Sequence, residues 1–148
     1  MKWYFDSREN QASLFRELEE WLGTPYKHLS STKKVGVDCI QFVGGVFQAI
    51  GVVEVVTIPA FAKDWAFHTH DERLYKIFCK TSWVVEVPLK EVMNGDILLY
   101  RFGKSTSHAG IYFDKNVYQA IDTVGVHKLL YRDKRFYRRR QYNFRVIA

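Results

Sequence analysis

The residue best placed for chemistry is Cys39, which stands at the start of a predicted helix. The helix covers residues 38–50, with Asp38 as its N-cap and Gly51 as its terminator. A thiol in the first turn lies at the positive end of the helix dipole, among free backbone N–H groups. Both favour the thiolate, which is the nucleophilic form, and the same N–H groups could hold an oxyanion. The alternative is a small buried hydrophobic residue, the usual role of a free cysteine.

A thiol nucleophile needs a base, and His108 is the candidate that the sequence offers. It lies in SHAGIYF, residues 107–113, whose alternation predicts a strand with His108, Gly110 and Tyr112 on one face. The small Gly110 leaves room beside the imidazole. A partly buried strand histidine with one hydrogen bond is the competing interpretation. The order of a cysteine on a helix and a histidine on a later strand favours the catalytic one.

The second cysteine, Cys79, has different surroundings. It falls within a predicted helix over residues 71 to about 79, in the bulky sequence KIFCKTSW, and we expect it to be buried and inert. His68 and His70 lie nearby in the chain, but no fourth ligand follows at a recognisable spacing. We therefore expect no metal ion and no cofactor.

These residues need a scaffold that brings a helix and a later strand together. Leucine and aromatic residues at helical spacing predict a first helix over residues 9–22, and a polar loop follows over 24–37. After Pro88 the pattern changes to short alternating segments. They predict strands at 96–101, 107–113, 117–121, 126–131 and 142–147. Helices first and strands second indicate an α+β fold, with the nucleophile helix packed on an antiparallel sheet.

The composition limits the classes of protein that remain. The chain has 148 residues, 47% of them hydrophobic, which suits a single domain over residues 1–148 and excludes a disordered chain. Two cysteines exclude a disulfide scaffold. No apolar run approaches the ~20 residues that span a bilayer, and no secretory signal is visible. We therefore expect no transmembrane segment and a cytoplasmic or virion-associated protein.

The net charge of +6 is concentrated near the end of the chain. Residues 132–145, from Arg132 to Arg145, contain seven Lys or Arg and one Asp, so the rest of the chain is balanced. This basic segment could contact an anionic polymer. The simpler interpretation is an edge strand whose charges protect it from aggregation. We expect no role in nucleic-acid binding.

Five motifs occur in an order and spacing that resemble the NlpC-type cell-wall cysteine peptidases, a papain-like family. They are GTPY at 23–26, GVDCIQFVGGVFQAIG at 36–51, NGDILLY at 94–100, SHAGIYF at 107–113 and VYQAIDTVGV at 117–126. The resemblance implies a papain-like fold and hydrolysis of an amide bond in peptidoglycan stem peptides. It implies Cys39 as nucleophile, His108 as general base and Gln119 as the third polar residue. It also places Tyr26 near the oxyanion.

Three features depart from the family pattern. Ile40 stands where the family usually has Ser or Ala, and Gln41 replaces the following Gly. In members that cut peptides with a free amino end, that Ser and the preceding Asp, here Asp38, help to hold the amine, so we expect Ile40 to exclude it. Gln119 replaces the usual His. Many members are secreted, whereas no secretory signal is visible in this sequence. A phage-encoded hydrolase or an enzyme that recycles wall peptides would need no such signal.

The residue that orients His108 depends on the register of two neighbouring strands. The family resemblance favours Gln119. Direct pairing of Gln119 with His108 would centre the turn on Phe113 and Asp114. Asp, Lys and Asn suit a turn better than Phe113, and a turn at residues 114–116 would instead put Asp122 opposite His108. A bulge in the second strand could reconcile this turn with Gln119, which we prefer.

Two other functions remain open on this fold. One is another acyl-transfer enzyme, such as a thioesterase, acyltransferase or protein amidase. It would need an apolar groove, which Ile40, Phe61, Trp65 and Phe67 could line. Lipid-acyltransferase relatives place the His before the Cys, which disfavours them here. The other is a catalytically silent binding or assembly module, for example in a phage tail, with the basic segment as its working surface.

Overall fold

A computed structural model describes residues 2–54 and 65–148 and shows an α+β fold with helices packed on an antiparallel sheet. The helices are the 3-10 turn η1 (Tyr4–Asp6), α1 (Arg8–Trp21), α2 (Cys39–Ala49), the 3-10 turn η2 (Trp65–Phe67), α3 (Arg73–Lys80) and α4 (Lys134–Tyr137). The strands are β1 (Ser31–Thr32), β2 (Gly36–Val37), β3 (Val84–Val87), β4 (Ile97–Phe102), β5 (Ser105–Phe113), β6 (Asn116–Ile121), β7 (Gly125–Leu130) and β8 (Arg140–Val146). The predicted fold class is confirmed. Among the described helices, none is long and apolar enough to cross a membrane.

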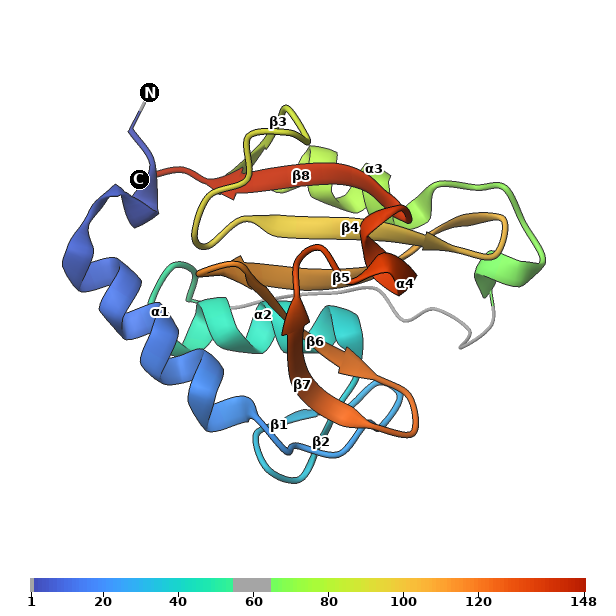
Figure 1. The fold of residues 1–148 in the computed structure, drawn as a ribbon, viewed down its shortest axis with the longest axis horizontal. Helices are drawn as coiled ribbons and strands as arrows, with labels where there is room; N and C mark the ends of the chain where they lie inside the picture. Colours follow the sequence, from blue (N-terminus) through green and yellow to red (C-terminus); the bar gives the residue numbers. More distant parts are fainter. Residues whose placement is uncertain (1, 55–64) are drawn as a thin grey trace.

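Six strands form the main sheet in the order β3-β8-β4-β5-β6-β7 (Figure 1). The five predicted strands are all present, with ends displaced by one or two residues. The sequence does not predict β3 or the small β1–β2 pair. Strands of four and two residues carry too little alternation to be told from a loop.

The main core lies between the sheet and the first two long helices. α2 contacts β5 and β6, and α1 packs beside it (Figure 1). Val43 and Val46 of α2 are buried there. Gly45 faces the indole of Trp21 so closely that a Cβ would lie 3.0 Å from the ring. The missing side chain therefore allows the two helices to approach.

β5 and β6 are joined tightly at one end and separate toward the other. Their two-residue turn consists of Asp114 and Lys115, whose φ angles are 47° and 68°. Positive φ at both positions gives a turn whose twist matches that of the flanking strands. Only three residue pairs follow the turn, and the last of them joins Ile111 to Tyr118. The two strands therefore part in the middle of β5.

This separation leaves one edge of β5 open. Tyr112 exchanges backbone hydrogen bonds with Asp96 and Gly95 on the β4 side. Because backbone groups alternate in direction along a strand, those of Ala109 and Ile111 face β6. At Ser107 the pairing with β4 shifts by one residue, which interrupts the alternation. Ser107 and Ala109 have no paired β6 residue in the described sheet.

The basic segment is folded differently from the predicted edge strand. Its first part forms α4, and its second part forms β8, which lies between β3 and β4 inside the sheet. Arg140 packs 3.6 Å from the ring centre of Tyr137 and donates to its carbonyl oxygen at 2.7 Å. Arg145 is buried. The edge-strand interpretation is therefore wrong, and two arginines of the segment are committed to contacts within the protein.

Arg145 belongs to a buried polar network that joins β8 to the start of β4. Its guanidinium donates to both carboxylate oxygens of Asp96, at 2.9 Å each. Asn143 donates to the same carboxylate at 2.9 Å, and so does the backbone N–H of Met93. Asp96 is completely buried. Its charge is therefore tolerated only because a cation and two further donors surround it.

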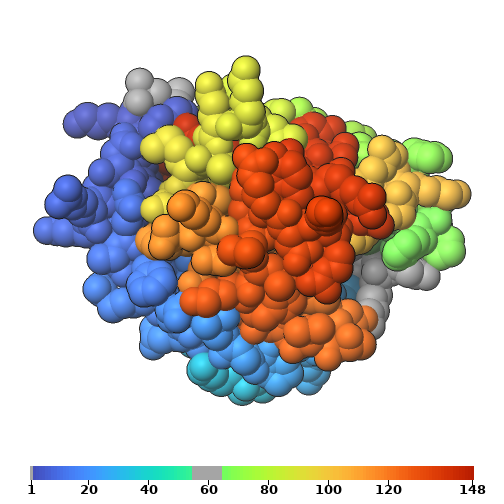
Figure 2. Space-filling model, viewed as in Figure 1, coloured from blue at the N-terminus to red at the C-terminus, as the bar shows by residue number. Residues whose placement is uncertain are grey.

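The C-terminal segment covers the opposite face of the sheet from α2. In Figure 2, the orange and red atoms of β7, α4 and β8 occupy the centre of the visible face. Phe136 and Tyr137 of α4 pack there against a second apolar cluster that includes Leu98 and Tyr100. This short helix therefore gives the sheet a second buried face.

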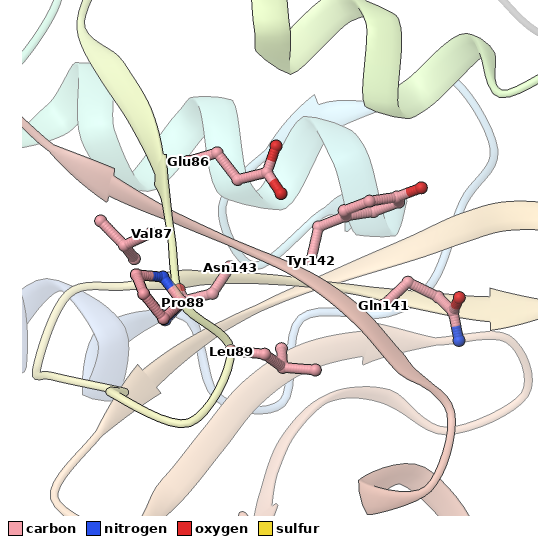
Figure 3. Close-up of a pocket in the computed structure, with 7 residues that line it drawn as sticks. All are labelled: Glu86, Val87, Pro88, Leu89, Gln141, Tyr142 and Asn143. Carbon is pink, nitrogen blue, oxygen red and sulfur yellow. The ribbon is translucent and has the colours of Figure 1, made fainter.

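A cleft of about 410 Å³ opens at the sheet edge where β3 ends. Its lining residues are Glu86, Val87, Pro88, Leu89, Gln141, Tyr142 and Asn143 (Figure 3). Val87 still pairs with Asn143, but Pro88 has no N–H group to continue the pairing. The lining includes neither a thiol nor an imidazole, so this cleft offers no nucleophile of the predicted kind.

We predict that Arg145→Met lowers the free energy of unfolding by about 3–5 kcal/mol, because the Asp96 carboxylate then stays buried without its cation. Arg138→Met removes an exposed arginine of the same segment and should change that free energy by less than about 0.5 kcal/mol. Urea unfolding followed by circular dichroism measures both. Equal effects of the two substitutions would contradict the assignment of Arg145 to the core.

Candidate active site

Asp38 fixes the point at which the preceding loop enters α2. Its Oδ1 accepts the backbone N–H groups of Ile40 and Gln41 at 3.1 and 2.8 Å, which confirms the predicted N-cap. Its Oδ2 accepts the N–H of Leu29 at 2.7 Å and ties the loop to the helix. Both oxygens are thus engaged by the backbone, and Asp38 is buried. The role toward substrate that the family resemblance implies for Asp38 stays a prediction.

The Cys39 thiol points at the open edge of β5. It donates a long hydrogen bond to the carbonyl oxygen of Ser107, with 3.9 Å between the two atoms, and the N–H of Ala109 also faces the sulfur. These are two of the β5 residues that β6 leaves unpaired. The N-terminus of α2 therefore takes the place of a strand at this edge. It holds the sulfur beside Ser107 and Ala109, the residues directly before and after His108.

The His108 ring is buried among three aromatic rings. The ring centres lie 5.7 Å from Tyr100, 5.6 Å from Phe102 and 6.1 Å from Phe136. Nε2 of His108 lies 2.7 Å from Oε1 of Gln119. A carbonyl oxygen can only accept a hydrogen bond, so Nε2 carries the proton and Nδ1 keeps the lone pair. Nδ1 is therefore the nitrogen that can take a proton from a thiol.

Gln119 reaches His108 along a diagonal between the two strands. The register of β5 and β6 extends to place Gln119 opposite Gly110, on the face that carries His108. A Cβ on Gly110 would lie 2.6 Å from a methyl carbon of Val117 and 3.4 Å from Cβ of Gln119. Glycine therefore lets β6 pass close to β5 just where the strands part.

Both strand registers considered from the sequence are wrong. The turn consists of Asp114 and Lys115 alone, so His108 stands directly opposite neither Gln119 nor Asp122. The hydrogen bond to Gln119 is present all the same, because the diagonal brings its amide within reach. Asp122 lines the cavity described next, near enough to Tyr26 for its charge to act on the phenol.

Cys39 and His108 line one cavity of about 650 Å³. The other lining residues are Tyr26, Phe67, Phe102, Ser107, Ala120, Ile121, Asp122 and Phe136. The position of Tyr26 agrees with the family resemblance. The sequence analysis did not identify Phe102 or Phe136. Phe102 ends an alternating strand and could have been found from it, but Phe136 lies in a segment that was conspicuous only for its charge.

Burial determines the protonation state of the two reactive side chains. It raises the pKa of the Cys39 thiol to about 12, and the neighbouring Asp38 carboxylate adds to the rise. It also lowers the pKa of His108 to about 4. The backbone N–H groups around the sulfur favour the thiolate but do not offset desolvation. At neutral pH this pair therefore rests as a neutral thiol and a neutral imidazole, and the expected thiolate is not the resting form.

Cys79 is exposed on α3, which contradicts the prediction that it is buried. The helix turns Leu74 and Phe78 toward the core, four residues apart, and Cys79 follows one position later, off that face. Among the described residues, no group of three or more His, Cys, Asp or Glu side chains is arranged to hold a metal ion.

Comparison with known families identifies the class of this chain. Residues 23–143 match the model of the NlpC/P60 family, which is most of the sequence. The protein therefore belongs to the NlpC/P60 family, as the resemblance of its five motifs predicts. A comparison with curated proteins finds no match.

Solved structures share the fold at low sequence identity. An NLP/P60-family, lipoprotein-like protein from Staphylococcus aureus aligns over 96% of this chain, with a TM-score of 0.67 and 19% identity, and the chain covers 43% of that protein. The NlpC/p60 domain of the peptidoglycan hydrolase SagA aligns over 93% of this chain and 98% of its own length, with a TM-score of 0.61 and 15% identity. RipD from Mycobacterium tuberculosis, described as a non-catalytic NlpC/p60 domain protein adapted to peptidoglycan binding, aligns over 93% of this chain and 97% of its own length, with a TM-score of 0.58 and 12% identity. The fold is therefore that of the papain-like NlpC/P60 domains.

We predict that iodoacetamide alkylates Cys39 slowly at neutral pH and faster up to at least about pH 9. A pKa near 12 keeps the thiolate fraction small across this range. Exposed Cys79 monitors the reagent within the same molecule. Mass spectrometry of the two cysteine peptides measures both rates. A rate at Cys39 that levels off below about pH 8 would show that the helix dipole outweighs desolvation.

Proposed function

We propose that this protein is a cysteine peptidase that hydrolyses an amide bond in peptidoglycan stem peptides. One observation carries the proposal: Cys39 and His108 line the same cavity, and Gln119 holds the imidazole with Nδ1 available. Membership of the NlpC/P60 family and the likeness to the SagA domain support the substrate class.

The reaction starts from a neutral pair. His108 Nδ1 takes the proton of the Cys39 thiol as sulfur attacks the carbonyl carbon, and a tetrahedral intermediate forms. The protonated imidazole then gives that proton to the leaving amine, the C–N bond breaks, and a thioester remains. A water molecule then loses a proton to Nδ1 and attacks the thioester carbon. The C–S bond breaks, the acid leaves, and the imidazolium returns its proton to the Cys39 sulfur, which restores the neutral pair. Gln119 accepts from Nε2–H throughout and keeps the ring in one orientation.

The oxyanion would face two hydrogen-bond donors near the N-terminus of α2. The N–H groups of Ile40 and Gln41 are already used by the Asp38 cap. The N–H of Cys39 remains close to its own sulfur. Tyr26 lines the cavity, and burial raises the pKa of its phenol, so the hydroxyl stays protonated and can donate. We therefore assign the Cys39 N–H and the Tyr26 hydroxyl to the oxyanion.

The alternative acyl-transfer enzymes need a longer apolar groove. Of the described residues considered for such a groove, Phe67 lines the cavity. Trp65 is buried in the core, and Ile40 packs against that core. Phe61 lies outside the described residues. Two of the three described positions therefore do not line the cavity, which favours a peptide over an acyl chain as the substrate.

A binding role without catalysis is the second candidate, because RipD is described as a non-catalytic member of the family that binds peptidoglycan. The present chain keeps a thiol and an oriented imidazole in one cavity. This cluster has no evident purpose in a protein that only binds, so it favours catalysis.

We predict that Cys39→Ala abolishes release of peptides from purified peptidoglycan, because no other thiol reaches the cavity in the described structure. Mass analysis of the soluble products measures the reaction and identifies the bond. Cys79→Ala is the matched control. It removes an exposed thiol and should leave turnover and stability nearly unchanged, within about 0.5 kcal/mol. Turnover that survives Cys39→Ala would remove the thiol mechanism.

We also predict that Gln119→Ala lowers kcat/KM about 10- to 100-fold, since the imidazole loses the acceptor that fixes its tautomer. Asp122→Asn, which keeps the shape of the cavity wall, should change the rate less than about threefold. Steady-state kinetics on a soluble stem peptide compares the two. If Asp122→Asn is the damaging substitution, the orienting role belongs to that carboxylate.

Recognition of the substrate amine gives a further prediction. Ile40 offers no polar group at the position after the nucleophile and packs against the core, and both oxygens of Asp38 bind backbone N–H groups. A blocked or cross-linked peptide should therefore be cleaved faster than one with a free amino end. Ile40→Ser should shift this ratio toward the free amine, as measured by competition between the two peptides. A strong preference of the unmodified protein for the free amine would contradict the role given to Ile40.

A further inference from the structure

One wall of the cavity is backed by an arginine that the mechanism does not use. Phe102 and Phe136 form this wall, with 5.6 Å between their ring centres. The guanidinium carbon of Arg139 lies 4.7 Å from the ring centre of Phe102. Arg139 is exposed, and it reaches the cavity wall through Phe102 without lining the cavity itself.

The position of Arg139 is fixed by the backbone on both sides. Its carbonyl oxygen accepts the N–H of Arg101 at 2.8 Å, and its own N–H donates to Phe136 at 2.8 Å. In the side chain, Nη1 donates to the carbonyl oxygen of Arg101 at 3.3 Å. A guanidinium has five N–H donors, so most of them remain for another acceptor.

Two basic residues of the same segment are paired with carboxylates, and Arg139 is not one of them. Arg145 is paired with Asp96, and Arg135 is paired with Asp133. Within the described parts of the chain, no carboxylate lies at ion-pair distance from Arg139. An aromatic ring that holds a guanidinium in place while its donor edges face solvent is a typical arrangement for binding an anion.

We propose that Arg139 is a specificity-determining residue that binds a carboxylate of the substrate on the Phe102 side of the cavity. This inference rests on the proposed peptidase function and adds the charge of the preferred peptide. The ring centres of His108 and Phe102 are 5.6 Å apart, so at most about 10 Å separates the imidazole from the Arg139 guanidinium. An extended peptide covers this distance in about three residues. The recognised carboxylate therefore lies within about three residues of the scissile bond.

Arg139 suits a carboxylate better than a lysine would. Its planar fork can donate two parallel hydrogen bonds, and it keeps its stacking on Phe102 while doing so. We therefore expect both Arg139→Gln and Arg139→Lys to weaken binding of an acidic peptide, with the larger loss for glutamine.

The test separates binding from hydrolysis. A synthetic stem pentapeptide with free carboxylates is compared with the same peptide carrying carboxamides, and both are titrated by calorimetry into the full chain with Cys39→Ala. We expect the acidic peptide to bind about 10-fold more tightly, and Arg139→Gln to abolish this preference. Arg138→Gln is the matched control, because it removes the same charge from the adjacent exposed position, and it should preserve the preference.

Three results would overturn the proposal. They are equal binding of the two peptides, an unchanged preference in Arg139→Gln, and an equal loss in Arg138→Gln, which would indicate general attraction to the basic segment. Circular dichroism verifies the fold of each variant, and Arg139→Lys serves in place of Arg139→Gln if the latter unfolds. Hydrolysis of both peptides by the unmodified chain is measured separately. If neither peptide is cleaved while the binding preference holds, the peptidase function fails and the carboxylate site stands.

Discussion

The open edge of β5 is the constraint on which the whole site depends. β6 leaves β5 after the pair of Ile111 and Tyr118, so the carbonyl of Ser107 and the N–H of Ala109 need another partner. The first turn of α2 fills that space, and the Cys39 sulfur faces both groups. The same divergence opens the cavity between the strands. A nucleophile, a base and a space for substrate thus follow from one interruption in strand pairing.

The electrostatics of the site follow from this enclosed position. The His108 ring lies among aromatic side chains, where a charged imidazolium is poorly solvated, and its pKa falls accordingly. A carboxylate beside His108 would have to bury its own charge in the same surroundings. The amide of Gln119 orients the ring without that cost. A neutral orienter therefore matches a neutral resting pair, and charge separates only as the thiol transfers its proton.

The sequence predicts those parts of the structure that are encoded locally. The five long strands carry their own alternation, and Cys39, His108 and Gln119 stand in motifs of recognisable order. Register was not predictable, because a one-residue change in the turn moves every partner on the opposite strand. The protonation states were not predictable either, since the helix dipole at Cys39 is visible in sequence but the burial that outweighs it is tertiary. Likewise, the ion pair between Arg145 and Asp96 was not predictable, because the two residues lie 49 positions apart in the chain.

The most direct test of this account is the protonation state of His108. Nitrogen-15 NMR of the histidine-labelled protein, with the His108 signals assigned by comparison with His108→Gln, reports both ring nitrogens as the pH is lowered. The account predicts a neutral ring at neutral pH, with the proton on Nε2 and the lone pair on Nδ1, that becomes protonated only near pH 4. An imidazolium at neutral pH, or a lone pair on Nε2, would contradict it.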